Sequence, residues 1–405
     1  MTSAASPSPE RERLVTPRFA LVVGSGLAYF MALGVVLPAV PQYVEDELGG
    51  GSLSVGIAVG SLFVGAVVLR PFVGRFGDRV GRRVLIVFGA AVVAVSIALY
   101  GLVASMPFLV GARLLTGLGE AAFFVGAATM ITDLAPPARR GEAISYWSVA
   151  VYGGLAFGPV LGEAVLDHEG FTATWMVAAS LALVAALLGL CTREVARPEA
   201  HTPPGPIVNR AAIGPGTVLF SGLISLAAFT AFIPLYVDQI GLRNADVVFL
   251  LYGGIVLAVR IFGARLPDSL GARAAGALAL GANAAGMAVM AVWGTTAGLL
   301  AGTVFFAIGA SLLYPALLLL ALGGAPESQR GSVVGTFSSF FDLSQGIGSL
   351  LVGLMAAATS YRGAFGLGAA CSLAGFFALR LHTARRGRSA HVDEAGALAV
   401  EHPGP

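Results

Sequence analysis

The chain alternates between long apolar segments and short polar ones. Each apolar run has about 20 residues, enough to cross a hydrocarbon core of roughly 30 Å as an α-helix. We therefore predict an all-α membrane protein with twelve transmembrane helices. The predicted spans are 19–40, 53–73, 84–104, 107–131, 143–166, 172–191, 213–236, 246–264, 274–293, 296–322, 332–357 and 363–381.

Composition supports an integral membrane protein. Of the 405 residues, 57% are hydrophobic and 11% are charged, whereas about a quarter of the residues of a soluble domain are charged. The first apolar run is too long for a cleavable signal, so we expect it to stay in the membrane behind a disordered tail at residues 1–18.

The arginines predict the orientation, and the chain contains no lysine. With the N-terminus in the cytoplasm, 21 of the 24 basic residues fall on or next to the cytoplasmic side. The exceptions are Arg113, Arg243 and Arg362. We expect both termini to be cytoplasmic in a multi-pass protein of the cytoplasmic membrane. The net charge of +2 reflects this topology and gives no reason to expect nucleic-acid binding.

The chain also repeats itself at an offset of 190 residues. The offset relates Arg70, Arg75, Asp78, Gly81, Arg83 and Gly158 to Arg260, Arg265, Asp268, Gly271, Arg273 and Gly348. Two six-helix halves in the same order are thus expected, at 19–191 and 213–381, related by an axis along the membrane normal. A charged, proline-rich cytoplasmic linker at 192–212 joins them, and residues 382–405 form a cytoplasmic C-terminal tail.

Three motifs carry a resemblance to a known family. They are GRFGDRVGRR at 74–83, RLLTGLGEAAFF at 113–124 and GLAFGPVLG at 154–162. All three resemble signatures of the major facilitator superfamily. In the first motif, Phe76 occupies a position that usually holds leucine. The resemblance covers residues 19–381 and implies a two-half transporter that works by alternating access. The third motif is associated with exporters. Residues 113–163 resemble bacterial arabinose-efflux-like or multidrug-like proton-coupled exporters.

The repeated loops after spans two and eight predict a cytoplasmic gate. Asp78 in its glycine-rich turn is placed to face the positive N-terminal end of span eleven near Gly331, and Asp268 that of span five near Gly141. The alternative is a simple topology anchor. The gate residues are Arg70, Gly74, Arg75, Asp78, Gly81, Arg82, Arg83, Arg260, Arg265, Asp268, Gly271 and Arg273.

Span five combines small residues with a proline. Gly154, Gly158 and Gly162 recur every four residues, so they share a face on which a neighbouring backbone approaches closely. Pro159 removes a helical hydrogen bond and is expected to bend the span. The alternative is ordinary small-residue packing.

Ionisable residues inside spans mark function, because each is costly unless it faces a cavity or a partner. Arg113 and Glu120 share a face of span four and lie about 10 Å apart along it. Asp342 lies about 18 Å into span eleven, and Glu163 lies near the outer end of span five. We expect Glu120 or Asp342 to carry a proton, with Arg113 biasing its release. For Arg113 and Glu120 the alternative is a purely structural pair. For Glu163 the alternative is a carboxylate that is merely solvated near the outer surface.

Polar residues also form a stripe on span eleven. Ser338, Asp342, Gln345 and Ser349 follow one helical face, which is expected to line the central cavity. The alternative is an interhelical hydrogen-bond cluster. The expected lining of the substrate pocket includes Tyr29, Phe123, Phe124, Tyr152 and Tyr314, whereas the three tryptophans at 147, 175 and 293 are expected at the membrane interfaces.

The intramembrane carboxylates predict proton coupling, and the resemblance implies that the transported small organic molecule or drug moves by efflux. We expect a monomer in membrane lipid, with the proton as coupling ion and no metal or other cofactor. The alternatives are a sugar or organic-acid uniporter or importer, and a non-transporting scaffold or sensor. An enzyme is not expected, because no nucleotide-binding glycine loop and no histidine or cysteine constellation occurs in the spans.

Overall fold

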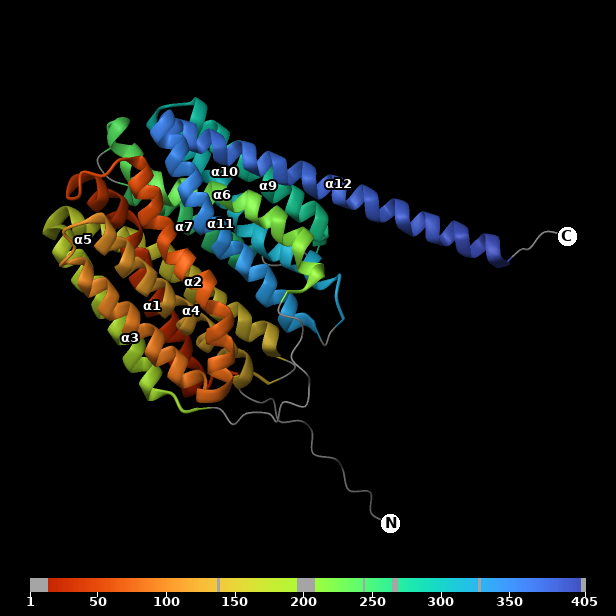
Figure 1. Ribbon diagram of the computed structural model, residues 1–405, viewed down its shortest axis with the longest axis horizontal. Helices are drawn as coiled ribbons and strands as arrows, with labels where there is room; N and C mark the ends of the chain where they lie inside the picture. Colours follow the sequence, from red (N-terminus) through yellow and green to blue (C-terminus); the bar gives the residue numbers. More distant parts are fainter. Residues whose placement is uncertain are drawn as a thin grey trace, which may run out of the picture. The chain divides into compact units, whose positions relative to one another are not determined.

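The computed structural model is helical wherever it has regular secondary structure (Figure 1). It describes residues 14–136, 139–194, 208–242, 245–263, 269–326 and 329–401, and no strand occurs within these ranges. The helices are α1 (Pro17–Asp46), α2 (Ser52–Val80), α3 (Arg82–Tyr100), α4 (Met106–Leu134), α5 (Arg140–Cys191), α6 (Arg210–Gln239), α7 (Asp246–Phe262), α9 (Ala272–Val292), α10 (Thr296–Leu322), α11 (Arg330–Ala358) and α12 (Tyr361–Glu401).

Most predicted spans coincide with one helix each. Among the described residues, nine helices are long and apolar enough to cross a membrane. The second and eighth predicted spans lie in α2 and α7, which are not among these nine. The count of twelve spans stays a prediction.

Both ends of the helical region extend beyond the predicted spans. Leu14 is buried and α1 begins at Pro17, so order starts inside the segment expected to be a disordered tail. At the other end, α12 continues past residue 381 to Glu401.

The fifth and sixth predicted spans run together in α5. The helix has one residue with non-helical dihedral angles, Gly170, at φ 79° and ψ −175°. This positive φ is readily adopted only by glycine, so a single residue replaces a loop between the spans. Pro159 keeps helical dihedral angles, and the bend expected there stays a prediction.

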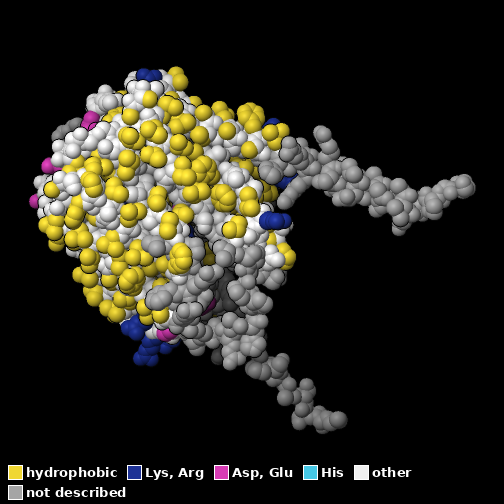
Figure 2. Space-filling model, viewed as in Figure 1, with side chains coloured by type: hydrophobic (Ala, Val, Ile, Leu, Met, Phe, Trp, Pro, Cys, Tyr) yellow, Lys and Arg dark blue, Asp and Glu magenta, His cyan; other side chains and the backbone are white. Residues whose placement is uncertain are grey.

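The outward-facing side chains fit a lipid environment. Hydrophobic side chains cover much of the described surface seen in Figure 2, and charged ones gather near its edges. Large apolar side chains such as Phe72, Phe262 and Phe377 expose 65, 87 and 60% of their surface. Such exposure is unfavourable in water and ordinary against lipid tails.

The chain forms two compact units. One lies within Met1–Ala39 and Gly65–Ala200, the other within Val40–Val64 and His201–Pro405. In the first unit α3 packs against α4 and α5, and in the second α6 packs against α11 and α12, with α9 beside α10. The segment 40–64, predicted as part of the first half, thus groups with the second unit.

The backbone preserves the sequence repeat at its turns. Gly81 and Gly271 precede α3 and α9 with φ of 106° and 80°, and Gly49 and Gly241 follow α1 and α6 with φ of 60° and 72°. Positive φ favours glycine at each of these turns. Equivalent turns therefore occupy equivalent places in the two halves of the sequence.

The glycine face of α5 packs directly on the backbone of α1. A Cβ atom added at Gly158 would lie 2.6 Å from Gly34 Cα and 2.7 Å from the Met31 carbonyl oxygen. Added Cβ atoms at Gly154 and Gly162 would also collide with the α1 backbone. The two helices therefore approach more closely than side chains would allow.

Replacing Gly158 with alanine should destabilise the protein, because its methyl group would collide with backbone atoms that cannot rotate away. We expect a loss of about 1–3 kcal/mol, measured by unfolding of the purified protein in detergent. Gly153→Ala is the matched control, since its new Cβ would meet only the Leu27 side chain at 3.6 Å. Equal stability of the two variants would contradict the close approach.

Candidate functional site

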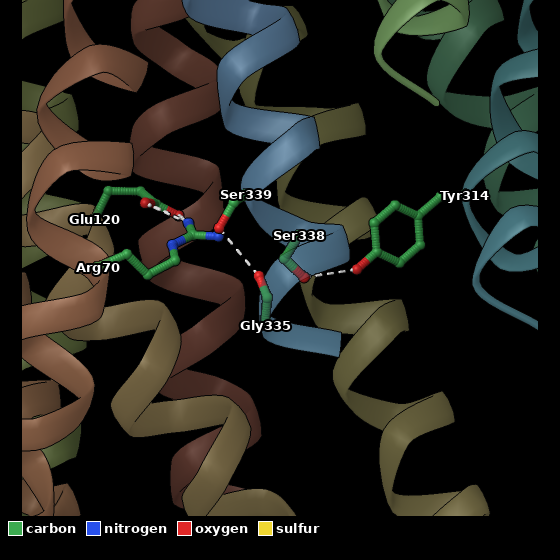
Figure 3. A network of polar contacts seen from close by, with 6 residues as sticks. All are labelled: Arg70, Glu120, Tyr314, Gly335, Ser338 and Ser339. Carbon is green, nitrogen blue, oxygen red and sulfur yellow. Dashed lines mark hydrogen bonds and ion pairs between the residues drawn. The ribbon is translucent and has the colours of Figure 1, made fainter. Parts of the chain in front are cut away.

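An ion pair between α2 and α4 lies inside the first unit. Arg70 Nη2 donates to both carboxylate oxygens of Glu120, at 2.9 and 3.2 Å (Figure 3). The side chains are only 12% and 10% exposed. Because each charge would be costly alone in an apolar bundle, the two groups stabilise each other.

A close helix crossing explains this pairing. A Cβ atom added at Gly65 of α2 would lie 2.6 Å from the Leu114 carbonyl oxygen of α4, so only glycine fits at the crossing. Arg70 follows Gly65 by five residues and Glu120 follows Leu114 by six. The long arginine side chain then reaches the carboxylate from its own helix.

This pairing gives Glu120 a partner that the sequence did not indicate. Glu120 was expected to interact with Arg113, seven residues earlier on α4, and both of its oxygens accept hydrogen bonds from Arg70. Arg70, expected in the cytoplasmic gate, lies against a buried carboxylate, and the roles of Arg70 in the gate and of Arg113 in proton release stay predictions. Arg113 is itself buried on α4.

One side of the ion pair faces a cluster of aromatic rings. The guanidinium carbon of Arg70 lies 5.2 Å from the centroid of the Phe124 ring, in cation–π range. Phe124 in turn contacts Phe30 and Trp147 edge to face, with centroids 6.4 and 6.2 Å apart. The sequence had suggested that Trp147 lies in a belt at the membrane interface. It is only 7% exposed, so it packs inside the protein instead.

Tyr29 of α1 brings an unsatisfied polar group to this cluster. Its ring stacks on Phe123, with centroids 3.7 Å apart. It is fully buried, and its hydroxyl makes no hydrogen bond with the described residues. A buried hydroxyl without a partner is costly, which marks a place where a ligand or a water molecule would gain a hydrogen bond.

Two other predicted residues of the first unit lie on α5. Glu163 is 2% exposed, so the alternative in which it is merely solvated at the outer surface is wrong, and its role as a candidate for proton coupling stays a prediction. Tyr152 is partly buried. Trp147 also lies on α5, and sequence reasoning missed it in the aromatic cluster because it lies near a predicted span end.

The polar stripe of α11 is buried inside the second unit. Ser338 and the Tyr314 hydroxyl of α10 lie 3.0 Å apart (Figure 3), and Gln345 Nε2 donates to the Leu223 carbonyl oxygen of α6 at 3.4 Å. Asp342 and Ser349 are buried as well. The two interhelical hydrogen bonds fit the cluster interpretation of the stripe, and a role in the central cavity stays a prediction.

The start of α3 is held by a carboxylate that the sequence analysis did not identify. Glu194, just after α5, accepts hydrogen bonds from the backbone N–H groups of Arg82 and Arg83 at 2.8 and 3.0 Å. In return, Arg83 Nη2 donates to the Leu190 carbonyl oxygen near the end of α5, at 2.6 Å. The N-terminus of one helix and the C-terminus of another are thereby capped reciprocally.

The rest of the predicted gate is only partly described. Arg82 Nε lies 3.6 Å from Asp133 Oδ2, in an ion pair. The Arg260 side chain is partly buried, and the Arg273 side chain is exposed. The side chains of Arg75 and Asp78 and the burial of Gly74 lie outside the described part of the chain, as do residues Arg265 and Asp268. Among the described side chains, no group of three or more His, Cys, Asp or Glu residues is arranged to hold a metal ion.

A double-mutant cycle tests the buried ion pair. Arg70→Gln leaves the Glu120 carboxylate unpaired, so we expect a loss of about 3 kcal/mol in the free energy of unfolding in detergent. Combining it with Glu120→Gln should reveal a coupling energy of about 1–3 kcal/mol. The exposed pair of Arg139 and Glu142 is the control, with an expected coupling below about 1 kcal/mol. Similar coupling energies for both pairs would show that burial does not strengthen the interaction between Arg70 and Glu120.

Known proteins resemble this chain over most of its length. A family model described as Major Facilitator Superfamily matches residues 22–321. An uncharacterized MFS-type transporter of Salmonella typhimurium strain LT2 is 30% identical over 359 residues, which cover 85% of this chain and 91% of that protein.

Solved structures agree in fold. The human organic anion transporter MFSD10 (TETRAN) has a TM-score of 0.69 at 20% identity, over 92% of this chain and 100% of that one. A bacterial homolog of the human lysosomal transporter Spinster, in an inward-facing and unoccupied conformation, has a TM-score of 0.71 at 17% identity, over 92% and 96%. The family model covers well over half of the sequence, and the helical fold is the one expected. The chain belongs to the major facilitator superfamily of membrane transporters.

Proposed function

We propose that this membrane transporter exports a small organic molecule in exchange for protons, by alternating access in the cytoplasmic membrane with both termini in the cytoplasm. The observation that carries the proposal is the Arg70–Glu120 ion pair. Export as the direction rests on the GLAFGPVLG motif in α5 and on the similarity of residues 113–163 to multidrug-like exporters.

The ion pair supports proton exchange because its carboxylate has a replaceable partner. Glu120 is nearly buried and is neutralised by a guanidinium on another helix. When Arg70 moves away, the carboxylate must gain a proton or another cation, since a bare charge is expensive in this environment. A group that alternates between an arginine and a proton is suited to couple proton movement to helix movement.

Asp342 is the second candidate proton carrier. It is buried on α11 in the second unit, within the polar stripe. The contributions of Asp342 and Glu120 to proton transport can be tested by separate substitutions, because the two carboxylates lie on different helices of different units. Glu163, also buried, is a third carboxylate to compare.

Transport in energised inside-out membrane vesicles tests the proposal. Proton movement is followed with a pH-sensitive dye while cationic, neutral and sugar-like compounds are added to vesicles containing wild type, Glu120→Gln, Asp342→Asn or Glu163→Gln. We expect at least one compound to dissipate the proton gradient with wild type, and Glu120→Gln to reduce the initial rate at least about tenfold, as expected for loss of a proton-transferring group.

Glu142→Gln is the matched control, since Glu142 is an exposed carboxylate that pairs with Arg139 at the start of α5. It should leave the rate unchanged. Full activity of both Glu120→Gln and Asp342→Asn would refute proton coupling through these carboxylates. Equilibration of a labelled sugar or organic acid without proton movement would instead establish a uniporter.

A further inference from the structure

We infer that Glu120 and Phe124 form a binding site for a planar, hydrogen-bonding cation, and that Arg70 occupies this site as an internal ligand when no substrate is present. The inference rests on the proposed transport function and names the substrate class for its site: an amidinium or guanidinium group carried on an apolar or aromatic body.

The geometry around Arg70 is already that of a bound cation. One guanidinium nitrogen, Nη2, donates to both oxygens of Glu120, while the central carbon lies 5.2 Å from the centroid of Phe124. A carboxylate beside an aromatic face attracts cations, because the ring quadrupole and the carboxylate both attract positive charge. The arginine shows that a planar cation fits between them.

Glu120 and Phe124 are held in place more firmly than Arg70. Glu120 and Phe124 lie four residues apart on one face of α4. The Phe124 ring is braced by Phe30 of α1 and Trp147 of α5. Arg70, in contrast, reaches the site from α2 on a long, flexible stem. Exchange at the site should therefore move the arginine and leave the carboxylate and the ring in place.

Tyr29 supplies the second observation that points to a ligand. Its hydroxyl is fully buried and has no hydrogen-bond partner among the described residues, and its ring contacts Phe30, which in turn contacts Phe124. Arg70 thus neutralises the Glu120 carboxylate but forms no hydrogen bond with the Tyr29 hydroxyl. A ligand with an additional N–H group or acceptor would satisfy it and so gain an advantage over the arginine.

An internal ligand lowers the apparent affinity of any competitor. If Arg70 occupies the site about 90% of the time, the apparent dissociation constant of a competing cation rises about tenfold. Removing the arginine side chain should therefore strengthen cation binding. A simple anion site on Arg70 predicts the opposite, because the same variant would remove the binding group.

The test compares two probes of nearly the same shape and opposite charge, benzamidinium and benzoate. Their binding to the purified full-length protein in detergent is measured by calorimetry and by tryptophan fluorescence. We expect Arg70→Gln to bind benzamidinium about tenfold more tightly than wild type. Glu120→Gln should lose benzamidinium binding, and benzoate should bind no variant measurably. Arg139→Gln, in the exposed ion pair at the start of α5, should behave as wild type.

A conservative variant covers the case in which Arg70→Gln does not fold. Arg70→Lys keeps a competing charge, but its ammonium is more strongly hydrated than a guanidinium and competes less well, so this variant should bind benzamidinium more tightly than wild type. Unchanged or weaker binding in both folded Arg70 variants would overturn the inference. Benzoate binding to wild type that disappears in Arg70→Gln would also overturn it, in favour of an anion site.

The vesicle assay separates this inference from the proposed function. If benzamidinium binding follows the prediction while Glu120→Gln retains full proton exchange, the cation site stands and the proton role of Glu120 fails. If Glu120→Gln abolishes proton exchange while benzamidinium binds no variant, the proposed function stands and the cation site is refuted.

Discussion

The protein depends on one constraint: a polar group placed between apolar helices must find its partner inside the protein, because lipid offers none. Backbone groups meet this constraint by forming helices, and the Gly158 and Gly65 crossings bring those helices close together. The charged pair of Arg70 and Glu120 meets it by mutual neutralisation. Any event that separates the pair therefore requires a replacement partner for each charge.

The sequence predicted those features that depend on local pattern. Apolar runs located the spans, the 190-residue offset located the repeat, and the repeat reappears in the positive φ angles of Gly81 and Gly271. The spacing of Gly154, Gly158 and Gly162 predicted a close helix approach, which α1 makes on that face. Each of these inferences needs only neighbouring residues or one internal comparison.

The partner of Glu120 was beyond such reasoning. Arg113 shares its helix and its face, so sequence spacing favoured it, whereas Arg70 lies fifty residues away on another helix. Choosing Arg70 requires the relative height and rotation of α2 and α4, which the Gly65 contact sets. The burial of Glu163 and Trp147 was missed for the same reason, since positions near predicted span ends were assumed to face solvent or headgroups.

The single-residue join at Gly170 has a consequence for how the chain tolerates change. Apart from its chain neighbours and the adjacent backbone of its own helix, no atom lies within 4 Å of a Cβ built there, so space is available at this position. Its φ of 79° and ψ of −175° are nevertheless strained for every other residue, by about 1–3 kcal/mol. Position 170 is thus restricted by backbone conformation rather than by crowding, and inspection of contacts alone would class it as freely variable.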